Sequence, residues 1–279
     1  MLRRTASPAL SRHPAATRSD AARVRTPWTW AALGLAMGGL PALLVFAPAQ
    51  WLAHGLRQAT NGQVQLLQAR GTVWNGHAQL LLTGGAGSRD QAALPGSIGW
   101  QLRPALTGLR LSITADCCTP APLQASVRVG WRSAQVQIDD HTSQWPAALL
   151  AGLGTPWNTL QPQGQLVLQT EGFALQWASG RAVLQGQARV DARAISSRLS
   201  TLRPMGSYRL QVQGGDLPSL TLATLEGDLL LSGSGQWVGQ RLRFAGEARA
   251  GRPEREGALA NLLNIIGRRQ GERSIITVG

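Results

Sequence analysis

The chain has 279 residues, of which only 15% are charged, and its 27 basic residues against 14 acidic ones give a formal net charge of +13. An apolar fraction of 43% excludes a disordered chain, and a count of two cysteines excludes a scaffold held by disulfides. The low charge and the 33 glycines favour weakly charged β-structure. All the basic residues are arginine. The high net charge therefore has to be interpreted from where these arginines lie along the chain.

Residues 1–27 predict a disordered, basic arm on the cytoplasmic side of a membrane. They hold six arginines and one aspartate, and their Ser, Ala, Pro and Thr content cannot build a core.

Residues 28–52 predict a transmembrane anchor. Positions 31–49 are almost wholly apolar, which matches the ~20 residues that a helix needs to cross a bilayer. Tryptophans, which prefer the headgroup zone, stand at both ends of the segment: Trp28, Trp30 and Trp51. Because the arginines of the arm precede the anchor, the positive-inside rule places residues 53–279 on the far side of the membrane.

A cleaved signal peptide is the alternative interpretation of the same segment, since Ala47-Pro48-Ala49 offers an A-x-A-like cleavage site. The long basic region, the length of the apolar run and the proline inside the site favour an uncleaved anchor. Both interpretations export the bulk of the chain.

Residues 53–279 predict one β-rich domain, because apolar and polar residues alternate along them. Clear alternation occurs at 63–66, 135–138, 208–213 and 242–244. Gly and Pro often interrupt these runs at eight to twelve residues, which favours antiparallel hairpins over βαβ units. Gly233-Ser234-Gly235 is interpreted as one hairpin turn. A division into two exported domains near residues 156–164 is possible on this pattern.

Three segments depart from the alternation. Residues 141–153 predict a short helix with a proline in its first turn, and residues 196–203 are polar and ambiguous. Leu259, Leu262, Leu263 and Ile266 recur at helical spacing and predict an amphipathic helix of about ten residues. Gly267 ends this helix at the usual C-terminal glycine position, Arg268-Arg269 complement its dipole, and a last strand follows at 274–278.

No residue pattern of an enzyme site is present in the sequence. The four histidines lack the spacing of metal ligands: His13, His54, His77 and His141. The only adjacent acidic pair, Asp139-Asp140, would point to opposite faces of a strand. No nucleophile-elbow, P-loop or dinucleotide motif occurs. We therefore expect no catalytic, cofactor-binding or metal-binding residues and no enzymatic activity.

The adjacent Cys117 and Cys118 cannot form a CxxC redox centre. In an oxidising compartment they form either a vicinal disulfide or two thiols in a turn before Pro120, and both alternatives give them a structural role.

Nucleic acid is not the expected partner, although the chain is rich in arginine. Outside the arm the arginines are spread along the strands, so the charge is better explained by membrane topology and by an arginine-only coding habit.

Several segments, in order and at their spacing, resemble the type II secretion system protein N family. They are Gly71-Thr72-Val73-Trp74-Asn75-Gly76, Gly99-Trp100-Gln101-Leu102-Arg103-Pro104, 164–168, 206–210, 225–233 and Ala260-Asn261-Leu262-Leu263-Asn264-Ile265-Ile266-Gly267-Arg268-Arg269-Gln270-Gly271. The likeness spans residues 28–279 and leaves out the cysteine pair.

This resemblance implies a non-enzymatic, accessory inner-membrane subunit of the machinery that exports folded proteins from the periplasm. It implies a single-pass topology with a periplasmic C-terminal domain, and other inner-membrane and secretin subunits as partners. It also implies a long, curved antiparallel sheet like that of AsmA-like envelope proteins. The alternative function is a protein that binds or moves lipid along an apolar groove of that sheet.

Overall fold

A computed structural model describes residues 28–178, 181–239 and 241–279, so the basic arm predicted at 1–27 and His13 lie outside the described residues. The chain divides into two compact units, Met1–Leu44 and Val45–Gly279. The first described element is α1 (Trp28–Val45), an uncharged helix of 18 residues with Pro41 inside it. Its length and its mean hydropathy of 1.5 would allow it to cross a membrane.

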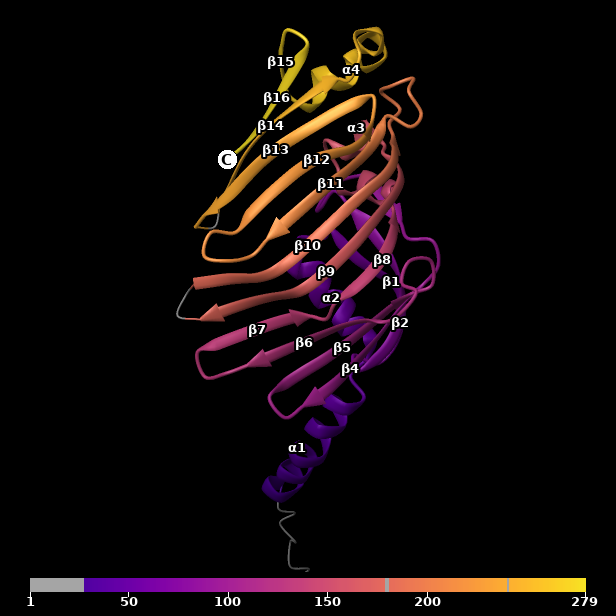
Figure 1. Ribbon diagram of the computed structural model, residues 1–279. Coiled ribbons are helices and arrows are strands. Elements are labelled where there is room, and N and C mark those ends of the chain that lie inside the picture. The colour runs from indigo at the N-terminus through magenta and orange to yellow at the C-terminus, as the bar shows by residue number, and fades with distance from the viewer. Residues whose placement is uncertain (1–27, 179–180, 240) are drawn as a thin grey trace, which may run out of the picture. The chain divides into compact units, whose positions relative to one another are not determined.

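The second unit is built on one antiparallel sheet of 16 strands (Figure 1). The strands are β1 (Val64–Gly71), β2 (Asn75–Thr83), β3 (Gln91–Ala93), β4 (Ile98–Ala105), β5 (Gly108–Ala115), β6 (Leu123–Val129), β7 (Ser133–Ile138), β8 (His141–Pro146), β9 (Gln163–Ala178), β10 (Arg181–Ser196), β11 (Gly206–Gln213), β12 (Ser219–Gly227), β13 (Leu229–Val238), β14 (Arg241–Ala250), β15 (Arg268–Gln270) and β16 (Arg273–Val278). Strand order follows chain order except that β3 pairs with β2, β8 pairs with β9, and β16 precedes β15. The mainly β fold with a short C-terminal helix is confirmed.

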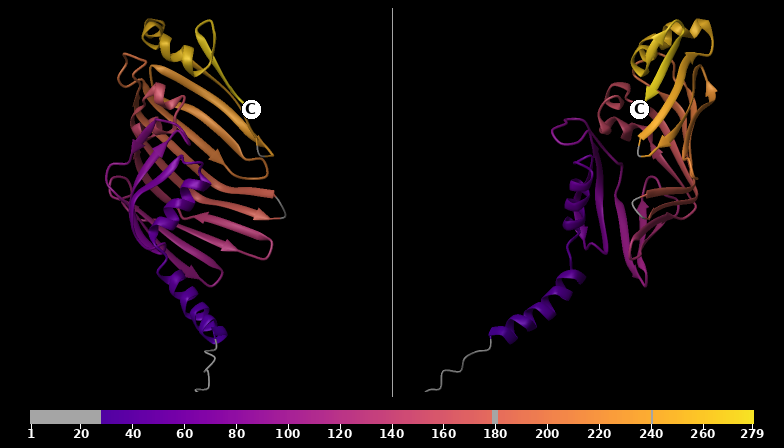
Figure 2. Two further views of the ribbon diagram at one scale, coloured as in Figure 1. Left: turned by 180° about the vertical axis from the view of Figure 1, so that it is seen from behind. Right: turned by 90° about the vertical axis from the view of Figure 1, so that its left-hand side faces the viewer.

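Five short helices accompany the strands. They are α2 (Ala49–Ala59), the 3-10 helix η1 (Ala147–Leu153), α3 (Trp157–Leu160), the 3-10 helix η2 (Pro253–Arg255) and α4 (Glu256–Ile266). Seen from behind, α2 lies in front of the strands (Figure 2, left).

The strand register sorts the side chains of the sheet onto an apolar face and a polar face. Residues paired across antiparallel strands point to the same side. Successive pairs on one side are Val127 with Val136, Val136 with Leu175, and Leu175 with Leu184. On the other side Gln135 pairs with Gln176 and Gln124 with Ser112. The predicted alternation is therefore kept in register from strand to strand.

Helices and loops cover parts of the apolar face with three hydrophobic clusters. Near the N-terminal edge Ala49 of α2 packs with Ala78 and Trp100. Next, Leu149 of η1 packs with Leu94 and Cys118. At the C-terminal end Leu259, Leu262 and Leu263 of α4 pack with the buried side chains Met205, Tyr208, Leu229 and Ala248. These clusters hold most of the buried hydrophobic side chains described in Val45–Gly279.

A line of irregularities crosses the middle strands and interrupts their pairing. Between β7 and β8, the Asp140 carboxylate Oδ1 accepts a hydrogen bond from Gly172 N at 2.7 Å. Gly172 and Gly186 have φ of +54° and +72°, and the β9–β10 register shifts between them. A side chain at Gly186 would collide with the carbonyl oxygen of Gly172, so the close approach of β9 and β10 at this irregularity requires glycine.

The prediction of one helix over residues 141–153 is wrong in its first half. His141–Pro146 form β8, whose residues pair with Gln165–Thr170 of β9, and only Ala147–Leu153 are helical, in a 3-10 helix. Pro146 is the last strand residue, where its missing N–H costs no ladder bond. Sheet pairing outweighed the local helical signal. In the ambiguous stretch 196–203, Ser196 is the last residue of β10 and the rest is a loop, with Ser197 and Ser200 buried.

Gly233-Ser234-Gly235 is not a hairpin turn but the interior of β13. Gly233 pairs with Gly246 and Gly235 with Phe244, so the three glycines and the ring share one face. A Cβ at Gly233 would run into the Phe244 ring. The glycines therefore make room for an aromatic side chain on the next strand.

The C-terminal helix α4 and the last strand β16 are confirmed, but Gly267 has a different role from the one predicted. Its backbone is extended, with φ −167° and ψ −177°, rather than left-handed. A Cβ there would stand 2.5 Å from the carbonyl oxygen of Ile275. Close approach of β16 thus explains the glycine. Arg269 pairs with Glu256, at the start of the helix, instead of complementing its C-terminal end.

Candidate functional site: the two faces of the sheet

The apolar face continues from β1 to β16. Trp100 pairs with Ile113, Val190 with Leu210, and Phe244 with Val278, and each of these pairs lies on this face. Between the covering clusters, side chains on it are only partly buried: Val127 and Leu175 are half-buried, and Val136 and Leu210 are 38% and 36% exposed. Such a stretch of incompletely covered apolar surface is the type of surface that binds another molecule.

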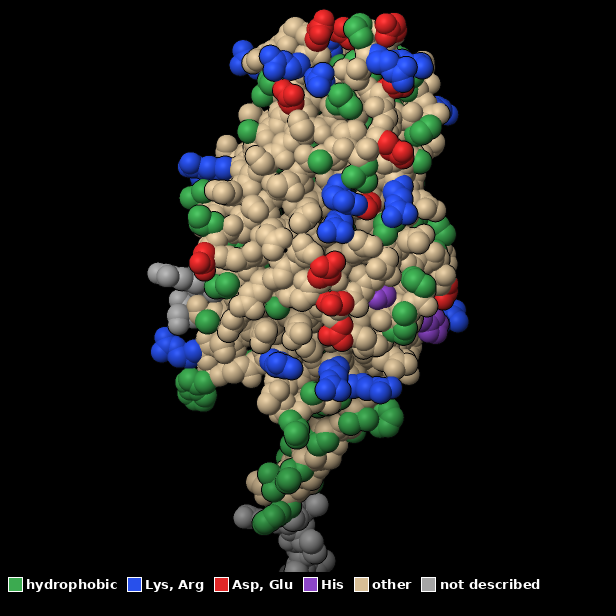
Figure 3. Space-filling view, viewed as in Figure 1, with side chains coloured by type: hydrophobic (Ala, Val, Ile, Leu, Met, Phe, Trp, Pro, Cys, Tyr) green, Lys and Arg blue, Asp and Glu red, His purple; other side chains and the backbone are tan. Residues whose placement is uncertain are grey.

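The opposite face is polar and weakly charged. Seen as in Figure 1, it consists mostly of uncharged, non-hydrophobic side chains and backbone, with scattered charged and hydrophobic side chains (Figure 3). Among the charged groups described on this face, Asp191 on β10 is the most enclosed. Its side chain is 7% exposed and accepts hydrogen bonds from Arg209 Nε at 2.7 Å and Nη2 at 2.8 Å.

The Asp191–Arg209 pair shifts the titration of both residues. The hydrogen bond from Arg209 holds the pKa of the Asp191 carboxyl below its usual range, and Coulomb attraction by Arg209, Arg193 and Arg189 acts in the same direction against the effect of burial. The same hydrogen bond raises the pKa of Arg209. The carboxylate is thus an internal counterion for three arginines of the polar face.

The other titratable residues considered from the sequence are not brought together. His54 lies on α2, His77 on β2 and His141 on β8. Asp139 and Asp140 lie at the break between β7 and β8, where Asp139 O accepts a hydrogen bond from Thr170 Oγ1 at 3.0 Å. Across residues 28–178, 181–239 and 241–279, no three His, Cys, Asp or Glu residues could hold a metal ion.

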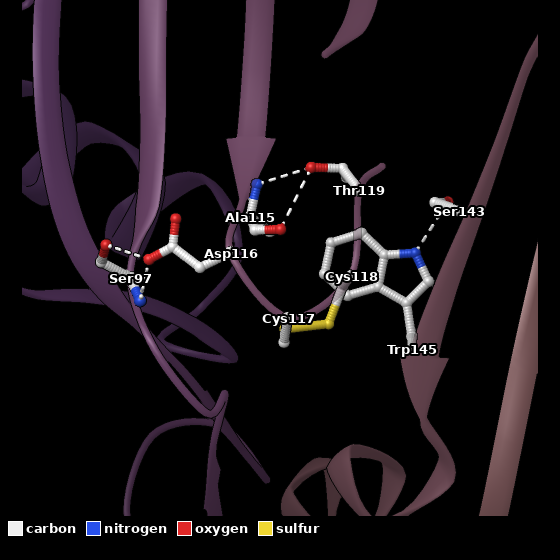
Figure 4. The surroundings of a disulfide bond; sticks show 8 residues. All are labelled: Ser97, Ala115, Asp116, Cys117, Cys118, Thr119, Ser143 and Trp145. Carbon is white, nitrogen blue, oxygen red and sulfur yellow. Dashed lines mark hydrogen bonds between the residues drawn. A yellow bond between two sulfur atoms is a disulfide. The ribbon is translucent and has the colours of Figure 1, made fainter. Parts of the chain in front are cut away.

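Cys117 and Cys118 form a vicinal disulfide in the turn after β5 (Figure 4). Ala115 N donates to Thr119 Oγ1 at 2.7 Å, and Cys118 O accepts from Gln144 N at 2.8 Å. Cys118 is 3% exposed, in the cluster against which Trp145 packs. These contacts join the β5–β6 turn to β8, which agrees with the structural role expected from the sequence.

Two hollows lie away from the apolar face, and charged side chains contribute to the walls of both. One of about 660 Å³ lies among α4, β14 and the β15–β16 hairpin, with Glu247, Arg249 and Arg273 in its wall. The other, about 510 Å³, lies between α2 and the loop before β3, with His54, Arg57 and Asp90 in its wall. Neither provides the enclosed apolar pocket that is typical of small-molecule sites.

The alternation in the sequence predicts an apolar face but does not specify which residues lie on it. That assignment depends on register, which the bulges at Gln68, Gly172 and Gly186 shift. For Gly172 and Gly186, the glycines inside otherwise alternating runs were the available signal in the sequence, whereas Gln68 offered none.

A family model for type II secretion system protein N matches residues 62–277, which take in the whole sheet except its last residue, Val278. The chain belongs to the type II secretion system protein N family. No curated protein and no solved structure matches the chain.

Membership of the protein N family makes the chain a component of the type II secretion machinery. The match begins at Gly62, in the turn before β1, and ends within β16, so it covers the sheet with its later helices and does not include α1 or α2. A type II secretion component with one N-terminal apolar helix is compatible with membrane anchoring.

Proposed function

We propose that this chain is a non-enzymatic, accessory subunit of the type II secretion machinery, held in the inner membrane by α1, with its sheet in the periplasm. The family match over residues 62–277 carries this proposal. The uncharged helix Trp28–Val45 and the arginines that precede it in the sequence support the topology. The sheet presents long polar and apolar surfaces to neighbouring subunits of the machinery. By binding these subunits it supports the export of folded proteins.

Deletion of the gene tests the accessory role. Export of folded enzymes should fall, the full chain should restore it, and crosslinking in intact membranes should recover other secretion subunits with the full chain. A variant with Leu35→Arg and Leu40→Arg, two charges within α1, should lose complementation because charges are costly in the bilayer. Gln135→Arg on the polar face is the matched control. Undiminished export in the deletion strain would contradict the role.

Protease accessibility tests the topology independently. In cells whose outer membrane is permeabilised and whose inner membrane is intact, added protease should digest the domain from residue 53 onward. Protection of the sheet in such cells, with cleavage only after lysis, would place it in the cytoplasm and overturn the proposed arrangement.

Lipid binding along the apolar face is the second candidate function, and one observation favours it. The face stays apolar from strand to strand. Among its described middle strands, β6, β7 and β9 contribute no residue to the three clusters, and β10 contributes only Ala192 and Ile195, near its end. Acyl chains would gain favourable burial against side chains such as Val127, Val136 and Leu175.

A phospholipid with a photoactivatable acyl chain tests this candidate on the full chain. Crosslinks should map to β6–β10, and Val136→Asp should abolish them while Gln135→Asp, on the adjacent polar-face position, should not. Crosslinks confined to α1 would count against a lipid groove and leave the secretion role untouched.

A further inference from the structure

Two adjacent hairpin tips expose large apolar side chains to solvent. Leu106, in the β4–β5 turn, and Trp131, in the β6–β7 turn, are 107% and 99% exposed, and Val129 beside Trp131 is 67% exposed. Val129 N donates to Thr107 O at 3.2 Å, which joins the two tips side by side. Exposed residues of this size are uncommon at turns, where small polar residues predominate.

Four exposed arginines surround these tips: Arg103, Arg110, Arg128 and Arg132. Arg103 pairs directly with Arg110 across β4 and β5, an arrangement of like charges that destabilises a sheet. Among the ion pairs of the described residues, none includes these four guanidinium groups. No acidic residue occurs from 91 to 115 or from 117 to 138. We call Leu106, Val129, Trp131 and the four arginines the hairpin-tip patch.

The chain enters the second unit at the same end of the strands. Val73 N donates to Ala47 O at 2.8 Å, and Leu102 N donates to Trp74 O at 2.7 Å, so Ala47 is linked through the β1–β2 turn to the part of β4 that leads to Leu106. Ala47 follows the last residue of α1 by two positions. A residue so soon after a membrane span stays near a bilayer surface, because one residue extends the chain by at most ~3.6 Å.

We propose that the hairpin-tip patch binds the surface of a bilayer that contains anionic phospholipid. The indole of Trp131 and the side chains of Leu106 and Val129 enter the interface, where Trp is the preferred aromatic residue. The arginines lie at headgroup level and pair with phosphate groups, which relieves the repulsion between Arg103 and Arg110. The sheet thus has a second membrane contact besides the anchor.

Hydrogen exchange of the full chain in nanodiscs tests this proposal. In one arm the nanodisc contains phosphatidylglycerol, and in the other a phosphatidylcholine nanodisc receives phosphatidylglycerol vesicles. Amides of 105–108 and 129–133 should exchange more slowly in at least one arm than in phosphatidylcholine alone. Leu106→Ser with Trp131→Ser should remove the protection, and each arginine replaced by glutamine should reduce it about fivefold.

The matched control carries Ile265→Ser and Arg268→Gln, two exposed positions at the opposite end of the strands, and should keep full protection. Circular dichroism checks that every variant retains its β-structure. Unchanged exchange in both arms would overturn the proposal. Tips that are already protected in detergent, together with a dimeric mass that the Leu106→Ser/Trp131→Ser variant abolishes, would make the patch an interface between copies and overturn it as well.

Discussion

Asp191 shows how single residues stabilise the polar face. Its carboxylate is enclosed, receives two hydrogen bonds from Arg209 and lies near Arg189 and Arg193. We expect Asp191→Ala to lower the free energy of unfolding by about 1 to 2 kcal/mol. This lies in the lower part of the range for loss of one partner of a hydrogen-bonded ion pair, because Arg209 is 37% exposed and water solvates it. Urea unfolding of the full chain in detergent measures this loss. Asp216→Ala, at an exposed turn, is the control and should change little.

The same carboxylate makes stability depend on pH. Since its pKa is lower in the folded chain than in the unfolded chain, where a carboxyl titrates at ~3.9, the folded state is stabilised above that value. The stabilisation disappears as pH falls through the lower, folded-state pKa. The difference in unfolding free energy between the wild type and Asp191→Asn should therefore shrink as the pH is lowered below about 4. A difference that is constant from pH 7 to strongly acidic solution would contradict this origin.

At the scale of elements, glycines allow the register of the long paired strands β9 and β10 to shift. Gly186 and Gly172 both have positive φ. A Cβ added at Gly186 would collide with backbone atoms, whereas a Cβ added at Gly172 would have no atom within 4 Å. We expect Gly186→Ala to cost about 2 to 4 kcal/mol and Gly172→Ala about 1 kcal/mol, the conformational part alone. Unfolding curves of the two variants provide the comparison. Equal losses would mean that the close approach of the strands carries no energetic weight.

The helix α4 is the element that closes the C-terminal part of the apolar face. Leu263 is fully buried, while Ile265, two residues later, is 46% exposed. Leu263→Ala should therefore cost about 3 kcal/mol and Ile265→Ala less than about 1 kcal/mol. Thermal unfolding followed by circular dichroism distinguishes the two. This helix was predictable because its apolar residues keep the 3.6-residue period, whereas β8 was missed because its pairing with β9 is a contact between distant residues.

At the scale of the molecule, the alternation of Gln with Leu or Val was enough to predict an antiparallel sheet. It was not enough to predict that the apolar side would remain in register through every strand. Register depends on single irregular positions such as Gln68 and Gly186, and on the close packing of Phe244 over Gly233. The hairpin-tip patch could not be predicted from the sequence either. The exposure of Leu106 and Trp131 depends on where the strands end and on which hairpin turns lie side by side. Composition fixes neither.

Most strands that pair in the sheet are consecutive in the chain. A local loss of stability should therefore affect only nearby strands, as in repeat proteins. Loss of the α4 core through Leu263→Ala should then increase hydrogen exchange in β13, β14 and β16, which lie beside or under that helix, and leave β4–β7 unchanged. Exchange measured by mass spectrometry on the full chain in detergent resolves these segments, and Ile265→Ala is the control. If Leu263→Ala raised exchange equally from β1 to β16, the sheet would unfold as one cooperative unit, and its two ends would not be energetically independent.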